Sequence, residues 1–490
     1  MDAGHPVLTY PFMLSRVLLI VFVSLLFLTA TAAGSAQTTE DRQLDREFQA
    51  ALSQYNAGHL VEAASELENL SRQVPQSFEV QELLGLVYAA QSQDAKATDH
   101  FEHAVRLQPK SAPARTNLAT SYVHLGKTVS AEAQFRKAVE LEPRNFEANH
   151  DLGEFYVKTG KLPEGATFLS AAQRINPESY DNGYDLSLCY FLTGRTRDSR
   201  QMVTELLKQK NTAELHNLLG EIEEKDGNFV PAANEFETAA HMDPSESNLF
   251  DWASELLLHR TLDPAIEVFR QAAARYPQSP RLAIGLGMAF YSRGNYDEAV
   301  KSLLRAVDLT PSDPRSYLFL SKAYDSSPGQ AGEVIDRFRR FAELQPKNPR
   351  AFYYYAMSLW KGRRAQDAGL DIAQIESLLK KAIGLDPTYA EAHLQLGNLY
   401  SDQTKYAEAI PEYKLALEHN SNLPDAHYRL AQAYVHTSQK DVAQKQFKIY
   451  QEQRAEHLAE LDKQRAEIRQ FVYSEKDSQL HQGGSGKASE

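Results

Sequence analysis

Acidic side chains recur along one side of several predicted helices, and this pattern could carry a binding function. At about 100° per residue, these acids lie opposite the apolar packing residues of their helices. They are Glu147, Asp151, Glu154, Asp181, Asp185, Glu214, Glu221 and Asp251. Carboxylates stacked along one wall attract cations, so the pattern indicates a surface for a basic segment of another protein.

Further along the chain, the same helix positions become aromatic and basic. The side chains concerned are Arg350, Tyr353, Tyr354 and Trp360. Four consecutive rings at 352–355 cannot all point into one core, so we expect some of them to be exposed. Together the two sets predict a groove that is acidic at one end and aromatic and basic at the other. The alternative, that the acids merely solvate a helix face, stays open.

Catalytic and metal-binding chemistry finds little support in the sequence. There is no HExxH helix, no GxSxG elbow and no DxDxDG calcium loop. The 15 histidines are scattered, and we expect them to be solvated or at helix ends. The one cysteine, Cys189, excludes an intrachain disulfide and a cysteine-based zinc cluster, and we expect it to be a small buried residue. We therefore predict a protein that is not an enzyme and has no cofactor or metal.

The overall charge bears on the class of partner. A formal net charge of -13 opposes binding to nucleic acid, which needs a concentrated Lys/Arg surface. With 42% hydrophobic and 24% charged residues, the composition is that of a folded soluble protein. We expect protein or peptide partners, some with basic segments.

A sequence repeat predicts the helices that position these side chains. Prolines recur at a constant interval at Pro75, Pro109, Pro143 and Pro177, and a period of about 34 residues is typical of a two-helix repeat array. The third unit shows the pattern clearly, with Leu118-Ala119, Tyr122, Gly126, Ala131, Phe135, Ala138, Leu141 and Pro143.

Each residue type in this pattern has a mechanical reason. Leu118 and Tyr122 lie on one face of a first helix, and Phe135 lies between two alanines on a second helix. The small residue after the leucine lets two helix backbones approach closely. Glycines such as Gly126 stand where the first helix must end, because glycine adopts the left-handed conformation without steric cost.

The pattern resembles the tetratricopeptide repeat family, in about twelve consecutive units from residue 44 to about residue 457. The resemblance implies an all-α fold, a right-handed superhelical solenoid whose inner groove takes peptide segments of partner proteins. Some members hold a C-terminal carboxylate with a Lys/Asn clamp, but Glu147, Asp151, Asp181 and Asp185 make the corresponding faces acidic here. Binding of a chaperone tail is therefore disfavoured.

The two ends of the chain differ from the repeats. Residues 17–28 are apolar and small residues follow, so residues 1–36 are predicted to be a signal peptide. An uncleaved membrane anchor over residues 17–33 is the alternative. The solenoid is expected over 37–457, a capping helix over 458–473 that could instead pair with a second copy, and a disordered tail over 474–490. Loop insertions are expected at 326–329 and 362–371.

These features predict an exported scaffold, periplasmic or extracellular, that binds partner segments in its groove. The alternative is a receptor for a glycan or other non-protein ligand, lying on the Tyr353, Tyr354 and Trp360 surface. The oligomeric state, the partner and the pathway are open at this point.

Export makes a first testable prediction. Mass spectrometry of the native protein should find a mature chain that begins near Gln37. An intact Met1 terminus in a membrane fraction would support the anchor, and a soluble intact chain would contradict both readings.

Overall fold

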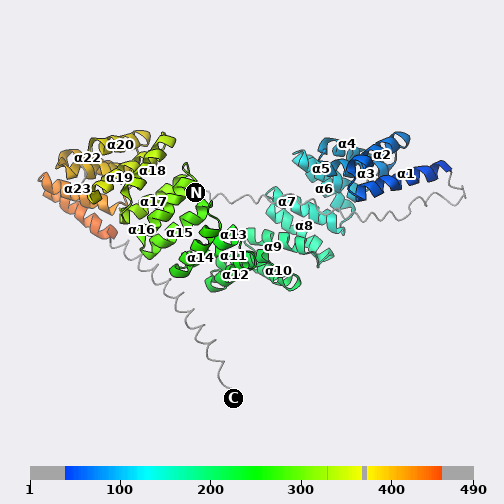
Figure 1. Cartoon of the computed structure of the whole chain (residues 1–490), viewed down its shortest axis with the longest axis horizontal. Helices are drawn as coiled ribbons and strands as arrows, with labels where there is room; N and C mark the ends of the chain where they lie inside the picture. The colour runs from blue at the N-terminus through cyan, green and yellow to red at the C-terminus, as the bar shows by residue number, and fades with distance from the viewer. Residues whose placement is uncertain (1–38, 328, 367–371, 455–490) are drawn as a thin grey trace, which may run out of the picture. The chain divides into compact units, whose positions relative to one another are not determined.

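A computed structural model describes residues 39–327, 329–366 and 372–454 of the 490-residue chain. Within these ranges every regular element is an α-helix, and consecutive helices pack as pairs (Figure 1). The first helices of the pairs are α1 (Thr39–Asn56), α3 (Phe78–Ala90), α5 (Ala112–His124), α7 (Phe146–Lys158), α9 (Tyr180–Leu192), α11 (Ala213–Lys225), α13 (Glu246–Leu258), α15 (Pro280–Arg293), α17 (Pro314–Ser326), α19 (Pro349–Gln366), α21 (Ala390–Asp402) and α23 (Pro424–His436).

The second helices alternate with the first along the chain. They are α2 (Leu60–Gln73), α4 (Asp94–Leu107), α6 (Thr128–Leu141), α8 (Leu162–Ile175), α10 (Thr196–Gln209), α12 (Phe229–Met242), α14 (Leu262–Arg275), α16 (Tyr296–Leu309), α18 (Ala331–Leu344), α20 (Ile372–Leu385) and α22 (Tyr406–His419). Residues 440–454 are helical and follow α23 as the second helix of the twelfth pair. The predicted all-α repeat fold is confirmed.

The chain divides into two compact units between Asp151 and Leu152, a point inside α7. The first unit contains α1 to α6 and the start of α7, with a core that includes Leu84 and Phe101. The second unit contains the rest of the helices, with two large apolar clusters of its own. Each unit therefore buries apolar side chains of its own helices.

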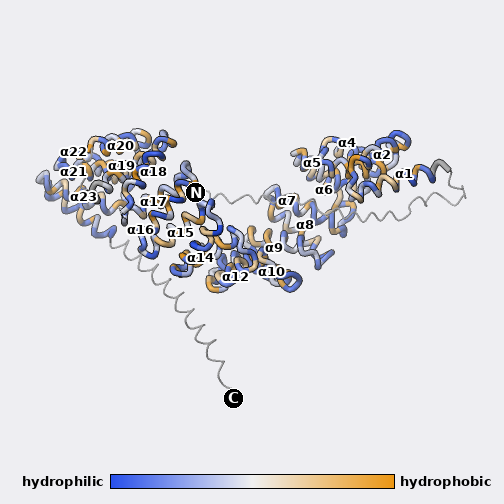
Figure 2. The backbone as a smooth tube through the Cα atoms, viewed as in Figure 1, coloured by the Kyte–Doolittle hydropathy of each residue, from blue (hydrophilic) through white to orange (hydrophobic). Residues whose placement is uncertain are grey.

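Apolar and polar residues alternate along the helices, as expected for helices that bury one side and expose another (Figure 2). Among the described residues, no helix is both long and apolar enough to span a bilayer. The predicted signal peptide, capping helix and tail all lie outside the described residues, so those expectations stay predictions.

A small residue on each of several first helices allows the close contact within a pair. A Cβ atom on Gly85 would lie 2.5 Å from the ring of Phe101, and one on Gly220 would lie 2.9 Å from the ring of Phe236. In both pairs the ring follows the glycine by sixteen residues (101 − 85 and 236 − 220). The same separation recurs in the pairs Gly153–Leu169, Gly287–Leu303 and Gly397–Tyr413. In these five pairs, the two helices therefore approach most closely at the same point of the repeat.

A polar side chain near the start of several first helices ties the two helices to the preceding loop. In α21, the His393 ring contacts the Pro387 carbonyl at 3.0 Å through Nε2 and Glu412 at 2.7 Å through Nδ1. His427, one repeat later, makes the equivalent contacts in the next pair. Both histidines are buried, which corrects the expectation of solvated histidines, and the bond to Glu412 raises the pKa of His393.

The turn between two paired helices contains a residue with a left-handed backbone conformation. The predicted glycines adopt it, with φ between 70° and 88° at Gly126, Gly160, Gly194, Gly227 and Gly294. Ser92, Arg260, Thr404 and Ser438 take equivalent places in other pairs, with φ between 57° and 64°. A side chain in this region is strained, so the turn geometry is imposed by the pair rather than by its residue.

The predicted loop insertion at 362–371 is wrong in its first part. Helix α19 continues through Gln366, and Gly362 is buried inside it. A Cβ on Gly362 would lie 3.0 Å from Cδ1 of Ile335 and 3.3 Å from the hydroxyl of Tyr324. This glycine therefore serves close helix packing, where sequence alone indicated a turn.

The contact between paired helices can be tested with two Gly→Ala variants. In Gly153→Ala, the new Cβ would lie 2.7 Å from Leu169 Cγ and 2.9 Å from the Leu169 backbone nitrogen. We expect a loss of about 1 to 3 kcal/mol in the free energy of unfolding. Gly384→Ala is the control, because no atom lies within 4 Å of its Cβ and the helix should gain about 0.5 to 1 kcal/mol.

Hydrogen exchange should localise the Gly153→Ala effect to α7 and its neighbours, because each repeat contacts only adjacent repeats. Equal loss of protection in all helices of the second unit would contradict this nearest-neighbour picture.

Candidate protein-binding surface

First helices of successive repeats lie next to one another inside each unit. In the second unit α9 contacts α11, α13 contacts α15, and α15 contacts α17. Between α11 and α13, Asn217 Nδ2 donates to Asp251 Oδ2 at 3.0 Å and to Asn248 Oδ1 at 3.3 Å. We call the surface that α9 to α21 form together the first-helix face of the second unit.

The predicted acids fall into two groups by exposure. Glu147, Asp181 and Glu214 are exposed, whereas Asp151, Glu154, Asp185, Glu221 and Asp251 are half-buried. Glu147 and Asp151 belong to the first unit, and the others belong to the second. Glu154 accepts a hydrogen bond from Lys158 at 2.5 Å, one turn further along α7, so its charge is balanced locally.

Four carboxyl groups of α11 and α13 influence one another electrostatically. Glu221 and Glu224 come from α11, and Asp251 and Glu255 come from α13. We call these four residues the acid cluster. The charge of Asp251 acts on Glu221 and Glu224, and the charge of Glu224 acts on Glu221 and Glu255.

Burial and like charge both disfavour ionisation in the acid cluster. Burial is the larger cause, and with the neighbouring carboxylates it raises the pKa of Glu221 to about 7. The pKa of Glu255 also rises to about 7, first through burial and then through Glu224. Burial likewise raises the pKa of Glu224 and of Asp251, in the latter case against the hydrogen bond from Asn217.

Glu255 is the most enclosed member of the cluster. Its side chain is 2% exposed, and Oε1 accepts no hydrogen bond among the described residues. His259 Nε2 lies 3.3 Å from this oxygen, but the contact lacks hydrogen-bond geometry and burial lowers the pKa of His259, which favours the neutral ring. A buried carboxyl group without a donor costs free energy in the isolated protein.

The two cations that act on the acid cluster are held by other groups. Lys225 Nζ donates to the Phe191 carbonyl at 2.9 Å and lies over the Phe191 ring. Arg281 Nε donates to Glu246 Oε1 at 2.6 Å. Lys225 lowers the pKa of Glu221, and Arg281 lowers the pKa of Asp251. In both cases burial raises the pKa by more.

The predicted aromatic end of the groove is wrong for two of its residues, which are buried. Tyr354 is 6% exposed and packs on Phe338 of α18, with ring centroids 5.7 Å apart. Trp360 is 8% exposed and belongs to a core cluster of the second unit. Because α19 packs against α17, α18 and α20, it buries several of its sides, and a wheel drawn for a helix with one buried side misplaces these rings.

The other two residues of that set remain accessible. Tyr353 is half-buried between Tyr354 and Tyr389, with centroids 5.7 Å and 5.2 Å away, and Arg350 is exposed. Arg350 and Tyr389 help to line a hollow of about 280 Å³ where the loops before α19 and α21 meet. The aromatic surface is therefore smaller than the sequence predicts.

Sequence reasoning missed Glu255 because the residue sits on the packing side of its helix. Ile222, one repeat earlier, is fully buried at the equivalent position, so a carboxyl group there breaks the apolar pattern. Glu82 in the first unit was also missed. It accepts a hydrogen bond from Asn117 at 2.5 Å, and burial raises its pKa to about 7. An acid inside an apolar stripe is the signal that would have found Glu255.

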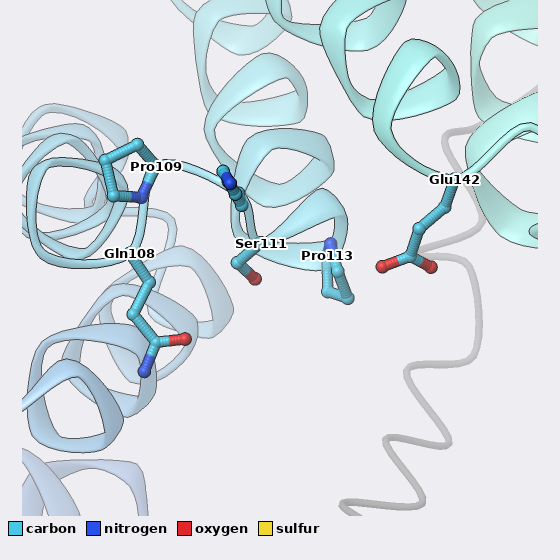
Figure 3. Close-up of a pocket in the computed structure, with 6 residues that line it drawn as sticks. Gln108, Pro109, Ser111, Pro113 and Glu142 are labelled. Carbon is cyan, nitrogen blue, oxygen red and sulfur yellow. The ribbon is translucent and has the colours of Figure 1, made fainter.

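Other candidate sites on the described residues are poor. A hollow of about 500 Å³ in the first unit lies between the loop before α5 and the end of α6 (Figure 3). Its lining contains none of the predicted binding residues: Gln108, Pro109, Lys110, Ser111, Pro113 and Glu142. Within the described ranges, no three His, Cys, Asp or Glu side chains are placed to hold a metal ion.

The fold and the surface define a class, an α-helical repeat protein with a charged face formed by its first helices. Its tetratricopeptide repeats match the family of that name over residues 48–112, 116–180, 250–314 and 394–456, which is more than half of the chain. The chain therefore belongs to the tetratricopeptide repeat family, whose repeats generally mediate protein–protein interactions.

The similar proteins YpiA and TMTC1 each match only part of the chain. The TPR repeat-containing protein YpiA of Bacillus subtilis is 25% identical over 233 residues, and the chain spans about half of its length, 53%. The human protein O-mannosyl-transferase TMTC1 is 24% identical over 156 residues, 32% of this chain and 17% of that enzyme. Among solved structures, the Cut9–Hcn1 complex aligns with 85% of this chain and 94% of its own at 15% identity and a TM-score of 0.35.

The acid cluster makes a prediction about stability and pH. A carboxyl group whose pKa is raised by folding keeps its proton in the folded state at pH values where the unfolded chain has lost it. For Glu221 and Glu255, stability should therefore fall as the pH rises from the ordinary value of 4.5 to about 7. The loss should be on the order of 3 kcal/mol for each of the two groups.

Urea unfolding at pH 5 and pH 8 measures this slope. The double variant Glu221→Gln, Glu255→Gln should flatten it, because glutamine does not titrate. Glu343→Gln on the exposed surface of α18 is the control and should leave the slope unchanged. An unchanged slope in the double variant would contradict the assignment.

Proposed function

We propose that the protein is a non-enzymatic scaffold of the extracytoplasmic space that binds segments of partner proteins along its first-helix face. Membership of the tetratricopeptide repeat family supports a role in protein–protein interaction. Export rests on the apolar residues 17–28 and on the small residues that follow them.

The acids of the first-helix face are the observation that carries the proposal. Some acids on second helices are paired with a cation one turn away, as in Glu267–Arg270 at 2.5 Å and Glu376–Lys380 at 2.7 Å. Glu221 and Glu224 on α11 instead feel the charge of Asp251 from α13. A surface that keeps unbalanced negative charge in this way attracts basic segments and steers their approach.

Two other functions are less well supported. A glycan receptor would need exposed rings for stacking, and the burial of Tyr354 and Trp360 removes most of that surface. The TMTC1 match covers 17% of that enzyme, so the activity in its name is not carried over to this chain.

The proposal predicts how charge controls partner capture. A pull-down from the native envelope with the exported chain should return protein partners, and binding of those partners is then measured on a surface at two salt concentrations. The double variant Asp181→Lys, Glu214→Lys should slow association and weaken its dependence on salt, because exposed charges act over a screening length of about 8 Å.

The matched control is Glu164→Lys, Glu205→Lys, which makes the same change in net charge on second helices α8 and α10. It should leave the association rate nearly unchanged. Equal slowing by both double variants would show that net charge, and not the first-helix face, governs capture. Failure to return any protein partner would contradict the scaffold role.

A further inference from the structure

The buried ring of His393 connects three parts of the eleventh repeat, which α21 and α22 form. The residue is 4% exposed and lies near the start of α21. Its Nε2 contacts the carbonyl oxygen of Pro387, in the loop before α21, at 3.0 Å. Its Nδ1 contacts a carboxylate oxygen of Glu412, on α22, at 2.7 Å. One ring therefore holds the loop, the first helix and the second helix of this repeat together.

Both partners of this ring are hydrogen-bond acceptors. A carbonyl oxygen and an ionised carboxylate have lone pairs and no hydrogen to donate. A neutral imidazole carries one N–H group, so it can donate to Pro387 or to Glu412 but not to both. The contacts of His393 are therefore satisfied in full only when both ring nitrogens carry a proton and the ring is positively charged.

The twelfth repeat has the same arrangement with one partner changed. His427 lies 34 residues after His393 (427 − 393), and its Nε2 contacts the Ser421 carbonyl at 3.3 Å. Its Nδ1 contacts the side-chain amide of Gln446 at 2.6 Å, and Gln446 stands 34 residues after Glu412 (446 − 412). An amide can turn to present its oxygen or its N–H groups, so a neutral ring satisfies both contacts there. The carboxylate of Glu412 is what requires the charge in the eleventh repeat.

The surroundings of His393 also favour the protonated ring. The hydrogen bond to Glu412 is the largest cause that raises its pKa above the ordinary value of 6.5. Burial acts in the opposite direction, and the contact with the Pro387 carbonyl and the charge of Asp386 raise the pKa further. A second histidine of α22, His419, has its ring centroid 6.1 Å from that of His393.

Charged side chains on α20 and α23, which also pack against α21, have other partners. On α20, Lys380 donates to Glu376 at 2.7 Å, and Glu376 accepts from Tyr400, near the opposite end of α21. On α23, Arg429 acts on the pKa of Tyr413. The groups that act on the His393 ring come from α22 and from the loop before α21.

We propose that His393 is a pH-sensitive switch: the doubly protonated ring holds the 386–389 loop against α22, and loss of one proton at higher pH releases that loop. Residues of this loop line the hollow of about 280 Å³ that Arg350 also lines, so release loosens one wall of the hollow. The switch goes beyond the proposed function, because it operates in the isolated protein and needs no partner.

Hydrogen exchange of the purified protein at pH 5.5 and pH 8.5 measures the switch, once rates are corrected for the intrinsic exchange of each amide. A histidine whose pKa is raised by folding contributes stability below its ordinary pKa of 6.5, and this contribution is lost as the pH rises through the folded value. Protection of segment 386–393 should therefore fall at least fivefold at pH 8.5. The equivalent segment 420–427 of the twelfth repeat should change less than twofold.

Three variants separate the switch from a general effect of pH. Glu412→Gln gives the eleventh repeat the partners of the twelfth, so the variant should fold, keep its protection at pH 8.5 and lose the response to pH. Gln446→Glu is the reciprocal change and should create a response to pH in segment 420–427. His419→Gln removes the second histidine of α22 and should leave the response of segment 386–393 in place.

The assignment is overturned if the two segments of the wild-type protein respond equally to pH, if Glu412→Gln leaves the response of segment 386–393 unchanged, or if His419→Gln abolishes it. An NMR titration of the protein labelled at histidine gives a second measurement, with His393→Gln to identify the signal. His393 should titrate above 6.5, and a pKa at or below that value contradicts the switch. The pull-down has no bearing on these outcomes, so the switch and the scaffold role stand or fail separately.

Discussion

The close contact between the two helices of each repeat is the constraint on which the rest of the structure depends. Where Gly85 or Gly220 faces an aromatic ring sixteen residues later, even one added carbon atom would collide with that ring. The two helix axes can approach only because one side contributes no side chain. Since the same separation recurs in five repeats, these repeats bring their first and second helices together at the same point.

This repeated contact decides what each helix leaves exposed. Second helices are amphipathic and carry balanced charge pairs, such as Glu267 with Arg270, on their outer sides. First helices contact the second helix of their own repeat, the preceding second helix and the neighbouring first helices. They are therefore enclosed on several sides. A polar residue on a first helix can therefore contact the next first helix. Asn217 of α11, for example, donates a hydrogen bond to Asp251 of α13.

The acid cluster works against stability in the isolated protein. Glu255 is buried without a hydrogen-bond donor, and the charge of Glu224 makes its ionisation harder still. A repeat array tolerates such a local cost because its stability is a sum over repeats and their interfaces. Elsewhere in the array, buried polar groups have hydrogen-bond partners. The rings of His393 and His427 each contact a side chain and a loop carbonyl.

The sequence by itself determined the fold class, the repeat length and the glycine turns, because a constant period with fixed small and large positions admits few packings. Only the tertiary structure showed that Glu255, Tyr354 and Trp360 are buried and that α19 runs past Gly362. The reason is physical: periodicity tells which side of a helix is apolar, whereas burial depends on how many neighbours that helix has, and neighbours are set by contacts far apart in the sequence.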